Sequence, residues 1–132
     1  MIVRQMQDLR QTDRDVRATT WTSVRLLLRH DGMGFSLHET TIHAGTETRM
    51  WYKHHQEAVY CIEGEGEITV LPDGPAYPIS PGTMYALDGH EPHLLRAITD
   101  LRLICVFNPP CTGREVHDAE GAYPLPQDAP AG

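Results

Sequence analysis

Two short segments of the chain concentrate side chains that bind metals or move protons. In the first, His55 and Glu57 precede Gly64, which follows the glutamate by seven residues. In the second, a Pro81-Gly82 turn is followed by His93. Imidazole and carboxylate groups serve as metal ligands and as general acids or bases, and eight histidines among 132 residues are more than usual. The two segments therefore predict metal-dependent or proton-transfer chemistry.

The elements that would position these side chains are short β-strands. Glycine and proline supply 11 and 10 residues and separate short apolar runs, which is typical of an all-β sandwich or barrel with about nine strands and no convincing helix. In a small barrel, inward residues of neighbouring strands converge on one axis, which leaves room for an ion and a small ligand. The first fifteen residues fit either an edge strand or a short helix. The other expected strands are 23–29, 35–43, 48–52, 57–62, 67–71, 84–87, 93–97 and 101–107.

Length and composition narrow the class of protein. A chain of 132 residues suits a single domain with a real core, and its last residues, 127–132, are expected to be a disordered tail. No apolar run is long enough for a membrane span, and the opening residues are too polar for a signal peptide, which favours the cytoplasm. The net charge of -7 without a basic stripe argues against nucleic acid as a partner. Three cysteines without metal spacing indicate reduced thiols, with Cys61 and Cys105 in the core.

A first resemblance follows from the spacing of Glu57, Gly64, the Pro81-Gly82 turn and His93. This pattern resembles the two motifs of the cupin superfamily, which implies a small jelly-roll-like barrel in which two hairpins aim ligands at one metal. The first cupin motif normally holds His-x-His before its glutamate. Here positions 52–57 read Tyr-Lys-His-His-Gln-Glu, so the usual set of three histidines and one glutamate does not carry over.

A closer resemblance covers residues 21–125. The stretches GFSLHETTIHAGTET, HHQEAVYCIEGEGE, YPISPGTMYALDGHEPHLLRA, CVFNPP and TGREVHDAEGAYPL are similar to those of the ectoine synthase family. The resemblance implies one iron ion (Fe²⁺) per chain, held by Glu57, Tyr85 and His93. A carboxylate, a phenolate and an imidazole make a hard donor set that suits iron and leaves positions open for substrate.

The same resemblance implies roles for further side chains. It implies catalytic roles for Tyr52, His55 and Glu115, the first two as an acid/base pair, and substrate-binding roles for Trp21, Arg25, Thr40, Phe107 and His117. Residues 1–126 would then be a cupin barrel with a C-terminal lid segment containing Glu115 and His117. The residues alone leave other interpretations open: a plain core position for Phe107, an outer-face arginine at 25 and a solvated tail for Glu115 and His117. His38 is left out of the site, and His90 is a loop histidine near enough to His93 to be a spare ligand.

The reaction implied by the resemblance is ring closure of N-γ-acetyl-L-2,4-diaminobutyrate to ectoine, with loss of water, in osmoprotectant biosynthesis. Two alternatives remain at this point: an iron-dependent cupin oxygenase, which would consume oxygen, and a non-catalytic cupin that binds a small ligand. A purely structural barrel is a third. Small cupins often dimerise by pairing edge strands, and the N-terminal segment is a candidate for such exchange in a homodimer.

Overall fold

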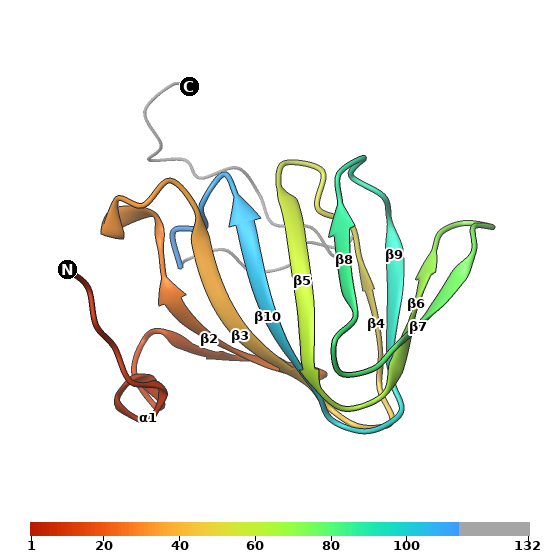
Figure 1. Ribbon diagram of the computed structural model, residues 1–132, viewed down its shortest axis with the longest axis horizontal. Helices are drawn as coiled ribbons and strands as arrows, with labels where there is room; N and C mark the ends of the chain where they lie inside the picture. Colours follow the sequence, from red (N-terminus) through yellow and green to blue (C-terminus); the bar gives the residue numbers. More distant parts are fainter. Residues whose placement is uncertain (114–132) are drawn as a thin grey trace.

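The computed structural model describes residues 1–113, which form two facing β-sheets (Figure 1). The larger sheet has the order β1-β2-β3-β10-β5-β8 and the smaller one β4-β9-β6-β7. This arrangement confirms the expected single all-β domain. The strands are β1 (Asp15–Arg17), β2 (Trp21–Leu27), β3 (Ser36–Ile42), β4 (Glu47–Met50), β5 (Gln56–Glu63), β6 (Gly66–Val70), β7 (Ala76–Ile79), β8 (Met84–Leu87), β9 (His93–Ala97) and β10 (Leu101–Asn108).

The chain crosses from one sheet to the other at several connections, including β4 to β5, β5 to β6 and β8 to β9. Gly64 lies at the β5–β6 crossing with φ 98°, and a β-carbon there would clash with the backbone of Asp100. From its glycines alone, Gly64-Glu65-Gly66 would be expected to form a hairpin turn, and this expectation is wrong because β5 and β6 belong to different sheets. The two ligand-bearing hairpins implied by the cupin resemblance are wrong for the same reason. A corner between sheets requires glycine for the same reason as a tight turn, namely positive φ and close backbone approach.

Most expected strands are present with shifted ends. The expectations for 84–87 and 93–97 agree with β8 and β9, whereas β4 ends at Met50, so Tyr52 lies in the loop that follows. The sequence did not predict β7, whose proline and flanking turns resemble a loop. β1 is only three residues long and lies at the sheet edge.

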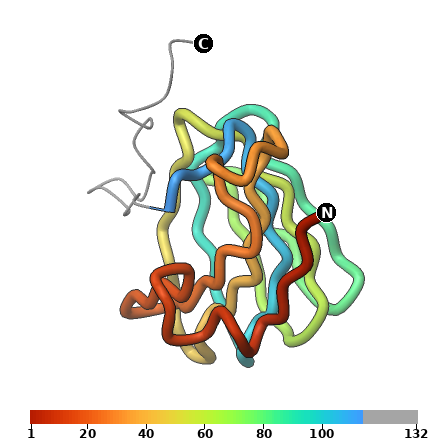
Figure 2. The backbone as a smooth tube through the Cα atoms, turned by 90° about the vertical axis from the view of Figure 1, so that its left-hand side faces the viewer, coloured from red at the N-terminus to blue at the C-terminus, as the bar shows by residue number. Residues whose placement is uncertain are grey.

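The N-terminal segment contains a short helix, α1 (Met6–Leu9), before β1, so both alternatives for this segment are partly correct. In Figure 2 the segment lies along the side of the barrel, and Arg4 anchors it by donating a hydrogen bond of 2.8 Å to the carboxylate of Asp31. A 3-10 helix, η1 (Arg29–Asp31), follows β2. Within residues 1–113, no helix is long and apolar enough to cross a membrane.

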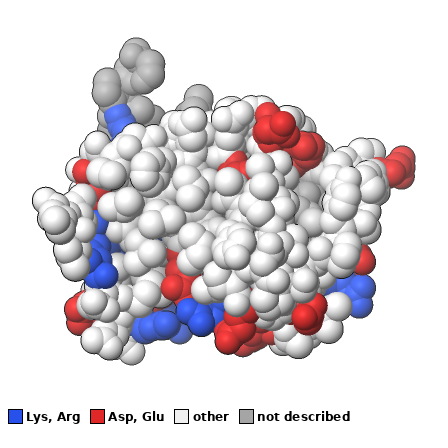
Figure 3. Space-filling view, in the orientation of Figure 1, with Lys and Arg blue, Asp and Glu red and all other residues white. Residues whose placement is uncertain are grey.

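The core fills the space between the sheets. Buried and exposed residues alternate along β5 and β10, so every second side chain of these strands points inward. All three cysteines are buried and free, which confirms the core positions expected for Cys61 and Cys105. The outer face of the larger sheet exposes Tyr60, Ile62 and Met84, and much of the face seen in Figure 3 is uncharged. Glu115, His117 and residues 127–132 lie outside the described residues.

Candidate active site

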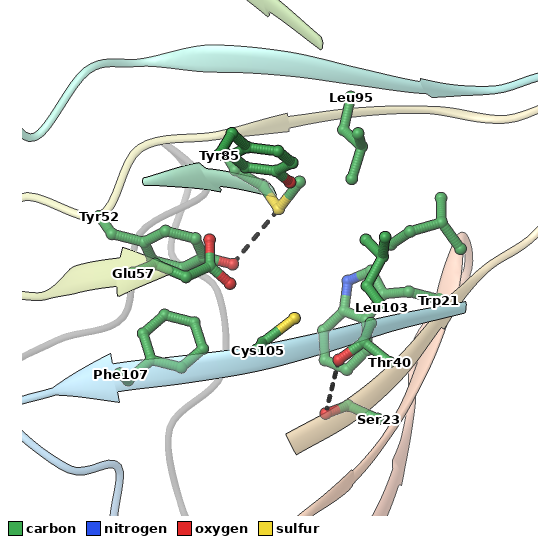
Figure 4. A pocket seen from close by; sticks show the side chains of 12 residues that line it. Trp21, Ser23, Thr40, Tyr52, Glu57, Tyr85, Leu95, Leu103, Cys105 and Phe107 are labelled. Atoms are coloured by element: carbon green, nitrogen blue, oxygen red, sulfur yellow. Dashed lines mark hydrogen bonds between the residues drawn. The ribbon is translucent and has the colours of Figure 1, made fainter. Parts of the chain in front are cut away.

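A pocket opens between the two sheets and brings together six of the side chains predicted for the site (Figure 4). They are Trp21, Thr40, Tyr52, Glu57, Tyr85 and Phe107. The remaining lining residues were not predicted from the sequence, and most are apolar: Ser23, Ile42, Met50, Leu95, Leu103 and Cys105. The lining is therefore apolar with a few polar groups directed inward, as is typical of small-molecule sites.

Glu57 and Tyr85 point into this pocket from the neighbouring strands β5 and β8. The glutamate is 7% exposed. Burial raises its pKa to about 8, although the thiol of Cys105 opposes the shift by donating a hydrogen bond to the carboxylate. Burial, and then the Glu57 carboxylate, raise the pKa of the Tyr85 phenol well above its ordinary value. Both groups thus sit where a nearby positive charge would stabilise their ionised forms.

His93 approaches the same region from β9 of the smaller sheet. It pairs with Met50, which lines the pocket, and its ring centroid lies 6.1 Å from that of Tyr52. The Nδ1 atom donates a hydrogen bond to the carbonyl oxygen of Glu91 at 3.0 Å, because a carbonyl can only accept. The buried Nε2 atom has no hydrogen-bond partner among the described residues. Since burial also lowers the pKa of His93, this nitrogen presents a lone pair toward the interior.

A carboxylate, a phenol and an imidazole are donor types that suit a hard metal ion. Within residues 1–113, no cluster of three His, Cys, Asp or Glu side chains has the arrangement of a metal site, so a metal here would require the tyrosine as a ligand. The Nε2 atom of His93, which has no partner among the described residues, offers a lone pair that a metal could take. The hydrogen bond from its Nδ1 atom to a carbonyl oxygen is of the kind that orients metal-binding imidazoles. Glu57 has an anomalously high pKa that a bound cation would lower.

The two residues predicted for proton transfer lie in the loop between β4 and β5. Tyr52 lines the pocket, and its hydroxyl donates a hydrogen bond of 3.3 Å to the sulfur of Met50. His55 is fully buried but is not among the lining residues. Both rings contact Phe107, with centroid distances of 5.1 Å for Tyr52 and 5.9 Å for His55. Phe107 therefore connects the two rings.

The opposite end of the pocket holds a small polar network on β2 and β3. Arg25 is 1% exposed, so the outer-face interpretation of this arginine is wrong. Its Nε atom donates a hydrogen bond to the hydroxyl oxygen of Ser23 at 3.2 Å, and the hydroxyl of Thr40 donates to the same oxygen at 3.2 Å. Alternation along β2 would have identified Ser23, because Trp21 and Arg25 lie two residues on either side of it and share its face.

His38, which the sequence analysis left out of the site, lies directly behind the pocket wall. It is 1% exposed, and its ring centroid is 5.0 Å from that of Phe107. Its Nε2 atom is 3.1 Å from the hydroxyl oxygen of Ser36, which also accepts a hydrogen bond from the backbone of Cys111. Burial, and then the charge of Arg25, hold the pKa of His38 well below its ordinary value.

The sequence matches a family model described as ectoine synthase over residues 1–127. A curated relative, L-ectoine synthase from Desulfatibacillum aliphaticivorans, is 63% identical over 130 residues, covering 97% of this chain and 100% of the relative. The L-ectoine synthase of Halalkalibacterium halodurans is 56% identical over 128 residues, covering 97% and 99%. The similarity thus extends over nearly the full length of each protein.

Solved structures agree with the sequence matches. The crystal structure of ectoine synthase from P. lautus has a TM-score of 0.87 at 57% identity and covers 98% of this chain and 96% of that chain. A Cupin_2 domain of a transcriptional regulator from Enterobacter cloacae has a TM-score of 0.58 at 18% identity, covering 70% and 99%. The second likeness concerns the fold alone and confirms the cupin-type barrel. The chain belongs to the ectoine synthase family.

Proposed function

We propose that this protein is an ectoine synthase that closes N-γ-acetyl-L-2,4-diaminobutyrate into the cyclic amidine ectoine. The observation that carries the proposal is identity of 54% or more to proteins named L-ectoine synthase, over at least 95% of this chain. In the reaction, the α-amine nitrogen bonds to the acetamide carbonyl carbon, and the carbon–oxygen bond breaks. The oxygen leaves as water, so no oxidant or reductant is needed, and the enzyme is a carbon–oxygen lyase.

We assign Glu57, Tyr85 and His93 as ligands of one iron ion. The lone pair of His93 Nε2, the buried Glu57 carboxylate and the inward Tyr85 phenol support this assignment. Lewis acidity at the acetamide oxygen is the chemistry that iron supplies when bound. Three protein ligands would leave coordination positions for the substrate.

The remaining steps fall to side chains of the chain itself. Tyr52 and His55 form the proposed acid/base pair, which removes two protons in turn from the α-amino nitrogen and delivers two protons to the departing oxygen, so that it leaves as water. Trp21 and Phe107 enclose the carbon chain, and their place in the pocket lining supports this role. Holding both ends of a flexible substrate together in a dry pocket favours ring closure, because orientation can contribute several kcal/mol.

The network of Arg25, Ser23 and Thr40 supports a substrate-binding role at the other end of the pocket. A guanidinium group is a strong donor to carboxylates, and Arg25 lies on the inner face beside Ser23. We propose that this end receives the substrate carboxylate. Glu115 and His117, which lie outside the described residues, remain proposed catalytic and substrate-binding residues on the strength of the sequence resemblance.

The decisive experiment combines an activity assay with metal analysis. Purified protein, reconstituted with Fe²⁺ under anaerobic conditions, should convert N-γ-acetyl-L-2,4-diaminobutyrate to ectoine, detected by proton NMR. An oxygen electrode should record no substrate-dependent oxygen uptake. Failure of the iron-loaded protein to form the ring product would refute the function, and stoichiometric oxygen consumption would indicate an oxygenase instead.

We further propose that the enzyme acts in the cytoplasm as a homodimer in osmoprotectant synthesis. The exposed apolar side chains of Met1, Ile2 and Val3 support pairing through the N-terminal segment. Light scattering coupled to size-exclusion chromatography should give twice the mass of the chain, and deletion of residues 1–3 should shift the protein toward the monomer. A monomeric full-length protein would contradict this part of the proposal.

A further inference from the structure

Two loops that cross between the sheets meet at the same end of the barrel (Figure 1). The loop 51–55, between β4 and β5, carries Tyr52 and His55. The loop 88–92, between β8 and β9, leads directly into His93. Neither loop belongs to a strand pairing, so contacts between the two loops contribute to fixing where these side chains lie.

His90 makes such a contact from the second loop to the first. Its Nδ1 atom lies 3.0 Å from the carbonyl oxygen of Tyr52 and 3.0 Å from the carbonyl oxygen of His55. Carbonyl oxygens accept hydrogen bonds and cannot donate them, so Nδ1 must carry the proton and share it between both acceptors. One imidazole N–H group thus holds both ends of the segment that contains the proposed acid/base pair.

A second hydrogen bond runs in the opposite direction. The indole Nε1 atom of Trp51 donates to the carbonyl oxygen of His90 at 2.8 Å. The loops are therefore joined by a reciprocal pair of contacts, one from each side. His90 is an exposed residue, so its contribution to core packing is small.

The backbone of His90 also has an uncommon conformation, with φ 56°. Among residues other than glycine, asparagine, aspartate and histidine adopt this left-handed region most readily. The conformation turns the ring back toward the 51–55 loop while the chain continues into His93. A substitution that tests the Nδ1 donor of His90 must therefore leave the backbone turn intact. This requires a replacement residue that also tolerates positive φ.

We propose that His90 is a positioning residue for the reaction, which holds Tyr52 and His55 in place through their backbone carbonyl groups. This inference rests on the proposed function of the pocket. His90 touches neither substrate nor metal in this role. Because misplacement of a catalytic group by about 1 Å can cost up to about a hundredfold in rate, a loosened 51–55 loop should lower kcat.

Two substitutions separate the donor from the backbone conformation. His90→Gly keeps the positive φ and removes the donor, and it should lower kcat about tenfold with little change in KM. His90→Asn keeps both features, since its amide nitrogen replaces Nδ1 on the same carbon and asparagine tolerates positive φ. It should recover kcat to within about threefold of wild type. His54→Ala, at an exposed histidine of the same loop, is the matched control and should behave as wild type.

A double-mutant cycle tests whether His90 acts through the acid/base pair. In a Tyr52→Phe background, His90→Gly should have no further effect on kcat, because residues that act as one unit are not additive. Equal losses of kcat in the glycine and asparagine variants, or full additivity with Tyr52→Phe, would overturn the positioning role.

Two further outcomes separate this role from the function itself. An active wild-type enzyme with an unimpaired His90→Gly variant would refute the positioning role alone. An inactive wild-type enzyme would refute the function and this role with it. Thermal melting of each variant shows whether lost activity reflects unfolded protein. If it does, kcat per folded molecule would stay at the wild-type value, and this would also refute the positioning role.

Discussion

The inner face of the six-stranded sheet carries most of the buried polar groups, whereas the inner face of the four-stranded sheet is almost entirely apolar. On the larger sheet the buried polar side chains are Ser23, Arg25, Ser36, His38 and Glu57. Among the described residues of the smaller sheet, His93 is the only one of this kind. Its neighbours on the inner face include Met50, Ile68, Ile79, Leu95 and Ala97.

This contrast separates two tasks in one small barrel. The larger sheet supplies polar groups that satisfy one another, such as Ser23 with Arg25 and Thr40. The smaller sheet closes the pocket with apolar side chains and contributes a single imidazole, whose Nε2 has no protein partner among the described residues. A buried polar atom left without a partner is costly, and this atom lies on an otherwise apolar face, which agrees with the ligand role proposed for His93.

Replacement of His93 should produce the largest effect, because it removes the one buried polar side chain among the described residues of the smaller sheet. We expect His93→Ala to lose iron binding and to lower activity at least about a thousandfold, since a metal Lewis acid contributes several kcal/mol. Iron content by mass spectrometry and product formation by NMR measure the two losses together.

Phe107→Ala provides the matched contrast from the larger sheet. Phe107 lines the pocket without a polar group, so its loss should weaken substrate binding while iron stays in place. Loss of iron in both variants would mean that general disruption of the barrel, and not ligation by His93, explains the first result.

Glu57→Gln tests a buried polar group of the larger sheet through the pH dependence of stability. In the metal-free protein the pKa of Glu57 is raised to about 8 from an ordinary 4.5. The folded state then binds more protons than the unfolded chain between these values, so the wild type loses stability as pH rises through that window. The stability of Glu57→Gln relative to wild type should therefore grow by about 3 kcal/mol between about pH 5 and about pH 8.

Urea denaturation of chelator-treated protein at both pH values measures this difference. Glu47→Gln, which alters an exposed carboxylate on β4, is the control and should show no comparable divergence. Added Fe²⁺ should reverse the order and make the wild type the more stable protein at the higher pH. If the stability of Glu57→Gln relative to wild type does not change with pH, the pKa of Glu57 is not raised in the metal-free protein.

Most of the fold was predictable because local patterns determine it. Alternation along β5 and β10 and the Pro and Gly turns identified nearly all strands of the core. The errors arose where one sequence signal serves two structures, as at Gly64, which permits a sheet corner as readily as a hairpin. Which strands join which sheet depends on contacts between distant residues, and no local pattern encodes these.

The site was less predictable from the residues alone. Spacing indicated Glu57 and His93, but Tyr85 and the proposed acid/base pair entered only through the family resemblance. Ser23 was missed because a polar residue in a strand looks the same whether it faces solvent or a pocket, unless its face is compared with that of Trp21 and Arg25, two residues away on either side. Burial decides between these cases, and burial depends on the partner sheet.

Ser23→Ala should give the smallest of these effects, because it removes one acceptor from the larger sheet and leaves the smaller sheet untouched. The hydroxyl oxygen of Ser23 accepts hydrogen bonds from Arg25 and Thr40, so its loss should cost about 1–3 kcal/mol of stability. Without this anchor the two donors are less well held, and KM should rise several-fold while kcat and iron content stay near wild type. Steady-state kinetics and metal analysis measure these quantities, with Thr22→Ala, on the opposite face of β2, as the control. If Ser23→Ala and Thr22→Ala raise KM equally, the backbone of β2, and not the hydrogen-bond network of Ser23, governs substrate binding. The proposed division of tasks between the two sheets would then be wrong.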